Sequence, residues 1–501
     1  MASKALRWRN LANWAAVLVI LTVGVAIRLY DLGDAPLDFH PTRQMHSALI
    51  ARGMYYRTLD DVPQWQQQRA IHQQQAEGLI EPQIMETLAA WSYRLAGAAD
   101  LWIPRLYAIF FWTMGGVGLY LLGRRLIGQW GALVALFLYM LLQYGILASR
   151  SFQPDPLMVA MIVWAWWGML RWQQQPSWAK AVIAGLLTGL AVYVKSTAAF
   201  FVAGAWIGLT LGGLGLKNTL RSKQWWLVCL LALLPYGVYL FYTTLGLGLM
   251  QGQFSLRFFP QMWVDPVFYL RWMLKVDSVT PLPWVLLALL GVFSLSGKAK
   301  RGLLLGVWAG YLVYGILFSY YISTHDYYQL PLLPLVALGA GAALQKVLAS
   351  LQGARWLAYG VAVVGLIVFG LAQIYAARDA LKSVDYNQEV ARVEQISSLF
   401  SPDDKIVALT PDYGMTFTYW GWLDVTNWFS TGDINLRELA GQSFDWQSYF
   451  RQETGGKDFF LITDFDELNA QPQVKQMLAA TYPVFSQGSD YLVYDLRGQQ
   501  P

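Results

Sequence analysis

Long apolar runs alternate with short polar segments from near the N-terminus to about residue 375. Each run is roughly 18 to 22 residues long, the length of helix that crosses a hydrocarbon core of about 30 Å. The pattern therefore predicts about eleven transmembrane helices. The expected spans are 11–29, 104–122, 131–148, 156–170, 179–194, 198–216, 225–245, 281–297, 302–320, 331–346 and 356–375.

The composition supports a polytopic membrane protein. Hydrophobic residues make up 56% of the 501 residues and charged residues only 13%, too few to cover a soluble chain of this size. Cys229 is the single cysteine, which excludes an intramolecular disulfide and a thiolate metal cluster. The net charge of +5 comes from short basic clusters between apolar runs. Such clusters set topology, so we expect no nucleic-acid partner.

The basic clusters also predict an orientation. The first apolar run is too long for a cleaved signal peptide and lacks a small-x-small cleavage site, so we expect a retained span with a cytoplasmic N-terminus. Every even-numbered gap should then be cytoplasmic, and these gaps carry the basic residues, as the positive-inside rule requires. They are Arg124 and Arg125, Arg171 and Lys180, Lys217, Arg221 and Lys223, Lys298, Lys300 and Arg301, and Lys346 and Arg355. We expect a plasma membrane location, in a bacterial inner or an archaeal membrane.

Three outward segments are too long to be simple connections. Residues 30–103 predict amphipathic helices on the membrane surface, with Trp65 and Trp91 as interfacial anchors, within a transmembrane domain of residues 1–378. Residues 246–280 are aromatic and basic. The third segment, 379–501, contains the β-rich runs KIVALT, DFFLITD and YLVYDL between helical stretches. These predict a small extracytoplasmic α/β domain.

The tail also contains Trp420, Trp422 and Trp428. These rings could stack on a sugar, although tryptophans in a small domain more often belong to its core.

Polar residues gather at the outward ends of the predicted spans. All four histidines (His40, His46, His72 and His325) fall in outward gaps. Around them lie the segments DFHPTRQ at 38–44, SRSFQPDP at 149–156, KST at 195–197 and YISTHDYYQLP at 321–331. An ionisable group at the edge of the hydrocarbon costs about 3 kcal/mol unless it is paired or hydrated. Several of them at one face therefore indicate a polar cavity.

The charges in these segments have both signs. Lys195, Arg43 and Arg150 could neutralise a phosphate, whereas carboxylates could act as a base or bind a metal; the candidates are Asp38, Glu81, Asp155 and Asp326. A phosphate bound at the membrane surface suggests a lipid-linked substrate.

Simpler explanations remain open for each cluster. Asp38 and His40 could form a turn before a helix, and Asp155 could cap the fourth span. Lys195 could extend its ammonium to the interface, and His325 with Asp326 could be ordinary loop polarity.

The order of these motifs resembles the C-type (GT-C) glycosyltransferases, in particular the branch of protein O-mannosyltransferases and lipid A aminoarabinose transferases. The resemblance is carried by IRLYDLGDAP after the first span, ALIARGMYY in the first loop, WIPRLYAIFF, SRSFQPDPLMVA, GLAVYVKST and HDYYQLPLLPLVAL. It implies a polyprenyl-phosphate sugar donor and an active site between the first outward loop and the membrane face. The acceptor would be a lipid, a glycan or a protein.

The resemblance also implies roles for individual residues. Asp38 would be the catalytic base of the first loop, Asp155 would assist the acceptor or a metal, and Lys195 would face the lipid phosphate. The motif before the tenth span would contribute His325, Asp326 and Tyr328 to the donor site.

This chain departs from the family pattern in two places. At the two positions where the family usually has an Asp-Glu pair, this chain has Arg43 and Gln44. Where the family usually has a basic residue or histidine before a proline, this chain has Glu81. The base therefore stays open between Asp38 and Glu81.

The resulting hypothesis is an inverting transfer in which Asp38 or Glu81 deprotonates the acceptor. Lys195, Arg43 and Arg150 then stabilise the departing phosphate. A divalent cation (Mg, Mn or Ca) held by Asp38, His40 and Asp155 is compatible with this scheme, but the sequence does not require a cofactor. The alternatives are a transporter or flippase of a lipid-linked substrate and a scaffold protein. The lack of charge at the span centres favours the enzyme.

Overall fold

A computed structural model describes residues 2–246, 256–351 and 355–498, and it divides the chain into two compact units. The membrane unit contains Met1–Leu32, Leu79–Ile84 and Arg105–Val384, and the second unit contains Gly33–Gly78, Met85–Pro104 and Asp385–Pro501. Residues 247–255 of the predicted outward segment 246–280 lie outside the described residues. The predicted domain boundary between residues 378 and 379 stays a prediction.

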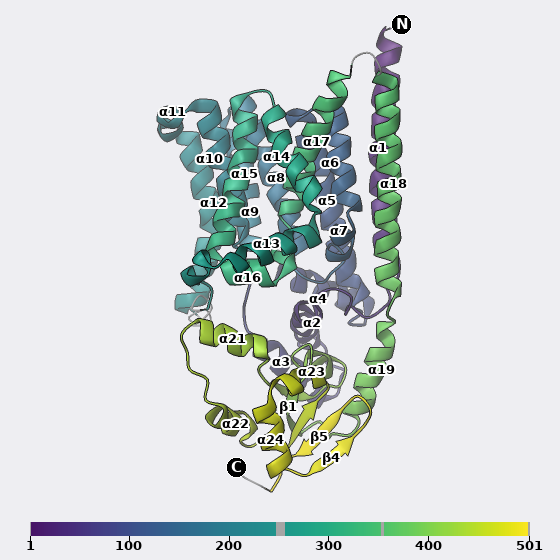
Figure 1. The fold of residues 1–501 in the computed structure, drawn as a ribbon, viewed down its shortest axis with the longest axis vertical. Helices are drawn as coiled ribbons and strands as arrows, with labels where there is room; N and C mark the ends of the chain where they lie inside the picture. The colour runs from purple at the N-terminus through teal and green to yellow at the C-terminus, as the bar shows by residue number, and fades with distance from the viewer. Residues whose placement is uncertain (1, 247–255, 352–354, 499–501) are drawn as a thin grey trace. The chain divides into compact units, whose positions relative to one another are not determined.

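The membrane unit is built from helices (Figure 1). They are α1 (Ala2–Leu29), α5 (Trp102–Leu126), α6 (Gln129–Leu141), α7 (Gln143–Ala148), α8 (Asp155–Gln174), α9 (Trp178–Val194), α10 (Ala198–Leu214), α11 (Leu216–Arg221), α12 (Lys223–Phe241), α13 (Pro266–Val279), α14 (Leu282–Ser294), α15 (Lys298–Leu317), α16 (Ser319–Thr324), α17 (Leu332–Ser350) and α18 (Arg355–Lys382). Short helical turns cover Tyr242–Gly246, Pro260–Val264 and Asp326–Gln329.

A helix overlaps each of the predicted spans. Among the described residues, five helices are long and apolar enough to cross a membrane, or six if α13 and α14, bent by 91°, count as one span. The membrane character is therefore confirmed, whereas the number of about eleven spans stays a prediction.

Glycines let α10 and α15 approach closely. Gly204, Gly208 and Gly212 on α10 face Gly302, Gly306 and Gly310 on α15, each set spaced by four residues. A Cβ added at Gly208 would overlap the carbonyl oxygen of Gly302, and one added at Gly204 would overlap that of Gly306. Residues later in α10 contact residues earlier in α15, so the two helices run antiparallel. Small residues at this spacing are typical of close packing between helices in membranes. We call this contact the glycine seam.

The second unit combines helices of the first loop with the C-terminal segment. The loop provides α2 (Pro41–Tyr56), α3 (Gln64–Ala76) and α4 (Ile84–Ala96). The C-terminal segment provides α19 (Tyr386–Ser397), β1 (Lys405–Leu409), α20 (Met415–Tyr419), β2 (Asp424–Asn427), α21 (Thr431–Leu439), α22 (Trp446–Thr454), β3 (Phe459–Ile462), α23 (Phe465–Ala470), α24 (Pro472–Thr481), β4 (Val484–Gln487) and β5 (Leu492–Asp495). The expected helices in the loop and the expected α/β character of the tail are confirmed.

The strands form one mixed sheet in the order β2-β1-β3-β5-β4. Figure 1 labels β1, β5 and β4 of this sheet. β1 pairs in parallel with β2 and β3, whereas β5 is antiparallel to β3 and β4. Alternate side chains point to opposite faces of the sheet, so Val407 and Phe460 belong to one core and Ile406 and Leu461 to the other. Trp428 is buried in the first core, as the commoner interpretation of the tail tryptophans predicts.

Candidate functional site

Three ionisable side chains of the membrane unit meet at one buried point, which we call the Lys195 cluster. Nζ of Lys195 donates to Oδ1 and Oδ2 of Asp155 at 3.0 and 2.9 Å. It lies 3.6 Å from Oε1 of Glu81, an ion-pair distance slightly too long for a hydrogen bond. The side chains of Asp155, Lys195 and Glu81 are 2%, 10% and 16% exposed, so Glu81 is the most accessible of the three.

The local backbone explains how two members of this cluster are placed. Asp155 is the first residue of α8, where the positive end of the helix dipole favours a carboxylate. Pro154 occupies the N-cap, so the alternative in which Asp155 caps the helix is wrong. Lys195 terminates α9 in an extended conformation, and α9 packs against α8. Its ammonium is paired with Asp155 inside the protein.

The Lys195 cluster brings opposite charges together away from water. Removing charges from water is costly unless they are paired, and Lys195 pairs with Asp155 and lies at ion-pair distance from Glu81. A partly exposed carboxylate beside this pair is a group that can accept a proton.

The predicted motif before the tenth span packs beside the Lys195 cluster. The ring centre of Tyr327 lies 5.4 Å from Nζ of Lys195, a distance at which a cation attracts a ring. Tyr328 stacks on Tyr321, and His325 approaches Tyr327 with ring centres 5.7 Å apart. Nδ1 of His325 lies 2.8 Å from Oγ1 of Thr324. The structure therefore joins the motif that contains His325 and Tyr328 to Lys195 through Tyr327.

Arg150 has a clear structural contact in the membrane unit. It is 1% exposed, and its two terminal nitrogens donate to the backbone carbonyls of Tyr30 and Asp31 at 2.8 and 2.7 Å. Arg28, on α1, donates in the same region to Oγ of Ser149 at 2.6 Å. These arginines fasten the end of α1 to the segment before α8. A role of Arg150 toward phosphate stays a prediction.

The other predicted site residues belong to the second unit. Asp38 and His40 precede α2, and Arg43 lies in its first turn. His40 is the N-cap residue in a left-handed conformation, with φ of 45° and no side-chain cap, and Pro41 starts the helix. Nε2 of Gln44 donates to the carbonyl of Phe39 at 2.7 Å and lies 3.5 Å from Oδ1 of Asp38. The expected turn before a helix is therefore present. The helix begins at Pro41, because proline suits the first helical position.

A buried arginine of the second unit was not predicted as a site residue. Arg52, on α2, is 3% exposed, and its guanidinium lies between the rings of Tyr419 and Trp422, 4.2 and 4.0 Å from their centres. It donates to the carbonyl of Tyr419, to that of Thr418 at 3.1 Å, and to Oε1 of Gln73 at 2.6 Å. Burial lowers the pKa of Arg52 to about 10, so the side chain is still charged at neutral pH.

A second unpredicted pair also involves α2. Nδ1 of His46 lies 2.6 Å from Oε2 of Glu77, and Oγ of the neighbouring Ser47 donates to Oε1 of Glu86 at 2.7 Å. These contacts tie α2 to the ends of the other loop helices. The sequence signal for these contacts is that polar residues, His46 and Ser47, lie among the buried residues of α2.

The described residues contain no group of three or more His, Cys, Asp or Glu side chains arranged to hold a metal ion. Asp155 is bonded to Lys195, whereas Asp38 and His40 belong to the second unit. A cation bound by these three residues stays a prediction.

Comparison with known proteins gives a family match over part of the chain and a shared fold. Residues 81–242 match the family described as dolichyl-phosphate-mannose-protein mannosyltransferase. No curated protein sequence matches the chain significantly.

Two crystal structures of ArnT from Cupriavidus metallidurans share the fold. The apo structure has a TM-score of 0.62 at 15% identity, covering 98% of this chain and 100% of that one. The structure bound to undecaprenyl phosphate has a TM-score of 0.61, also at 15% identity, covering 97% and 98%. The matched segment includes Glu81, Asp155 and Lys195. Residues 81–242 thus resemble the mannosyltransferase family, and the chain as a whole shares the fold of ArnT.

Proposed function

We propose that this protein transfers a sugar from a polyprenyl-phosphate donor to an acceptor at the extracytoplasmic face of the plasma membrane, with inversion at the anomeric carbon. The observation that carries the proposal is the Lys195 cluster, in which Asp155 at the start of α8 and Lys195 at the end of α9 form a buried ion pair beside the partly exposed Glu81. Phosphate recognition and proton removal need these two kinds of group.

The comparisons support this donor class. The matching family is described by a lipid-phosphate sugar, dolichyl phosphate mannose, and ArnT has been crystallised with undecaprenyl phosphate. A phosphate that leaves from an anomeric carbon is already a good leaving group. The protein therefore has to neutralise it and does not have to protonate it.

Lys195 is the proposed phosphate ligand. Its ammonium has three N–H groups, and two are directed at the oxygens of Asp155. The third can reach a phosphate oxygen in place of the longer contact with Glu81. Asp155 then holds Lys195 in position, and His325 and Tyr328 support the donor side through Tyr327.

Glu81 is the proposed base because it is the most accessible carboxylate of the cluster and has no hydrogen bond to Lys195. It takes the proton of the acceptor hydroxyl as the acceptor oxygen bonds to the anomeric carbon. The bond from that carbon to the phosphate oxygen breaks, and polyprenyl phosphate leaves with the electron pair. Asp38 is the alternative base, Arg43 and Arg150 are further candidate phosphate ligands, and His40 is a candidate ligand for a cation.

The experiment is a transfer assay with the purified protein in liposomes. A polyprenyl phosphate carrying radiolabelled mannose or aminoarabinose is supplied with lipid, glycan and peptide acceptors, and released polyprenyl phosphate is measured. The proposal expects turnover that is lost in Lys195→Met and kept in Lys475→Met, a surface lysine bonded to Asn469. Movement of the donor across the bilayer without cleavage would instead identify a flippase.

A further inference from the structure

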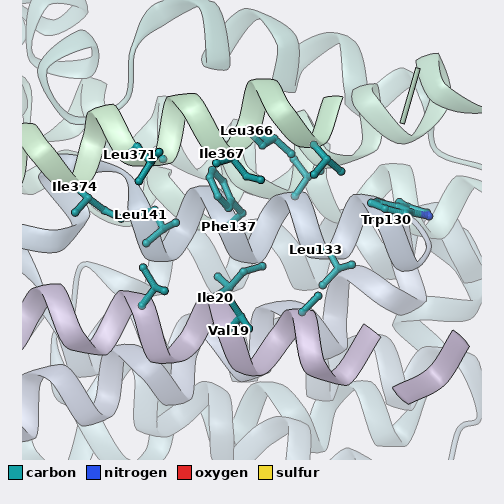
Figure 2. A pocket seen from close by; sticks show the side chains of 15 residues that line it. Val19, Ile20, Trp130, Leu133, Phe137, Leu141, Leu366, Ile367, Leu371 and Ile374 are labelled. Carbon is teal, nitrogen blue, oxygen red and sulfur yellow. The ribbon is translucent and has the colours of Figure 1, made fainter. Parts of the chain in front are cut away.

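An apolar cleft of about 340 Å³ opens between α1, α6 and α18 of the membrane unit. Figure 2 shows the side chains that line it, all from these three helices, and none of them carries an ionisable group. They include Val19 and Ile20 from α1, Phe137 and Leu141 from α6, and Ile367 and Leu371 from α18. α1 and α18 run side by side along one edge of this unit (Figure 1). Val19, Ile367 and Leu371 are also partly open to the outside, at 60%, 52% and 61% exposure.

The length of the cleft matches one leaflet of a bilayer. Along α18 its lining runs from Val363 to Ile374, roughly 16 Å at the helical rise of 1.5 Å per residue. This is about half of a hydrocarbon core of 30 Å. A single acyl chain that extends through one leaflet therefore fits the cleft, whereas a polyprenyl tail of many isoprene units would continue beyond it.

One end of the cleft carries a positive charge. Arg378 lies four residues after Ile374, on the same face of α18, and its side chain is exposed. Its guanidinium lies 5.6 Å from the ring centre of Tyr30, just past the end of α1. Asp379 follows in sequence and points about 100° around the helix, away from this face. The rings of Trp130 and Tyr359, 4.7 Å apart, mark the other end.

We propose that this cleft is a binding site for a phospholipid with an anionic headgroup. One acyl chain occupies the apolar lining between α1, α6 and α18, and the phosphate pairs with Arg378. The lipid fills the space between α1 and α18 and the rest of the helices. The site contains no residue of the Lys195 cluster, so it is separate from the proposed donor site.

The test is photo-crosslinking of the full chain in phosphatidylcholine liposomes with phosphatidylglycerol that carries a diazirine on one acyl chain. Labelled peptides are mapped by mass spectrometry. Label should concentrate on residues 16–23 and 363–374. Ile367→Trp should lower labelling there about tenfold, because excluding even two methylenes from the cleft has that effect on occupancy. Leu290→Trp, on an exposed apolar position of α14, is the matched control and should leave it unchanged.

The headgroup is tested by competition. Unlabelled phosphatidylglycerol should displace the label better than phosphatidylcholine, and Arg378→Gln should reduce this preference about fivefold. Labelling spread evenly over the outer helices would overturn the site. Displacement by polyprenyl phosphate but not by phosphatidylglycerol would overturn the proposed ligand. The competition uses the unmodified protein, so it decides the question even if Ile367→Trp fails to fold.

Discussion

The two units each bury a basic side chain, but they satisfy it differently. Lys195 of the membrane unit faces two carboxylates, Asp155 and Glu81, within 4 Å. Arg52 of the second unit is held by backbone carbonyls, the Gln73 amide and two aromatic rings. The two arrangements differ in whether the partners of the buried cation can change their protonation state or be replaced by a ligand.

The surroundings of Arg52 are neutral and fixed. Its partners come from two helices and a turn, and none of them titrates near neutral pH; burial raises the pKa of Tyr419 to about 12. The partners of Lys195 include two carboxylates, Asp155 and Glu81, and a carboxylate can take up a proton or give way to a substrate group. A buried cation with neutral partners therefore stabilises the structure, whereas one that contacts carboxylates is suited to chemistry.

The largest effect is expected from removing the ammonium of the Lys195 cluster. Lys195→Met removes the ammonium that pairs with Asp155 and the proposed ligand of the donor phosphate. Turnover should fall about 10³-fold, the usual effect of losing a group that stabilises a departing anion. Release of polyprenyl phosphate is the measurement, and Lys195→Arg should retain part of the activity. Activity of Lys195→Met within twofold of the unmodified protein would place the chemistry elsewhere.

The next prediction separates the two candidate bases. Glu81→Gln should lower turnover roughly 10²- to 10⁴-fold at unchanged donor binding, because general base catalysis has this magnitude. Asp38→Asn, measured in the same assay, should lower it less than tenfold. The opposite order would move the base to Asp38 of the second unit.

Arg52→Gln tests the structural member of the comparison. It leaves buried carbonyls without a donor, and we expect a loss of about 3 kcal/mol in the free energy of unfolding of the second unit. Hydrogen exchange of α2 and α20 is the measurement. The exchange rates of Arg52→Lys should lie between those of the unmodified protein and those of Arg52→Gln. The control is Arg57→Gln, since Arg57 is exposed near the end of the same helix and binds Gln74. Equal exchange in the Arg52 and Arg57 variants would contradict this role.

The smallest effect is expected for an exposed charge pair. Arg497 hydrogen-bonds Asp495 at 2.8 and 2.9 Å and lowers the pKa of this carboxyl. A lowered pKa stabilises the fold above the unfolded value and loses this effect as the pH falls through the folded value. Asp495→Asn should therefore shift Tm by about 1 °C or less at pH 7 and by less at pH 3. A larger shift would mean that exposed pairs in this unit matter more than their accessibility suggests.

The sequence predicted best those strands that are apolar along most of their length. KIVALT, DFFLITD and YLVYDL are β1, β3 and β5, whose buried faces require apolar residues. β2 (DVTN) and β4 (VFSQ) were missed because they are the edge strands, and no residue of either is fully buried.

The sequence predicted a shared polar cavity but not which of its residues meet. Lys195, Asp155 and Glu81 each stood out as ionisable groups next to apolar runs. Their meeting depends on how α8 packs against α9 and on the segment 79–84, and residue spacing does not encode this packing. Arg52 was missed because an arginine in a helix is usually exposed, and only Tyr419 and Trp422, far away in sequence, show that it is buried.

The glycine seam has a consequence for how this protein tolerates sequence change. At Gly204, Gly208, Gly302 and Gly306 even alanine would force two backbones apart, because the obstacle is a carbonyl oxygen and not a movable side chain. Random mutagenesis should therefore find positions on α10 and on α15, spaced by four residues along each helix, that tolerate no substitution. Neither helix contributes a residue to the Lys195 cluster. In a variant library that is scored only for activity, substitutions at these glycines would be as damaging as substitutions of a catalytic residue. The glycines nevertheless contact no substrate in our proposal.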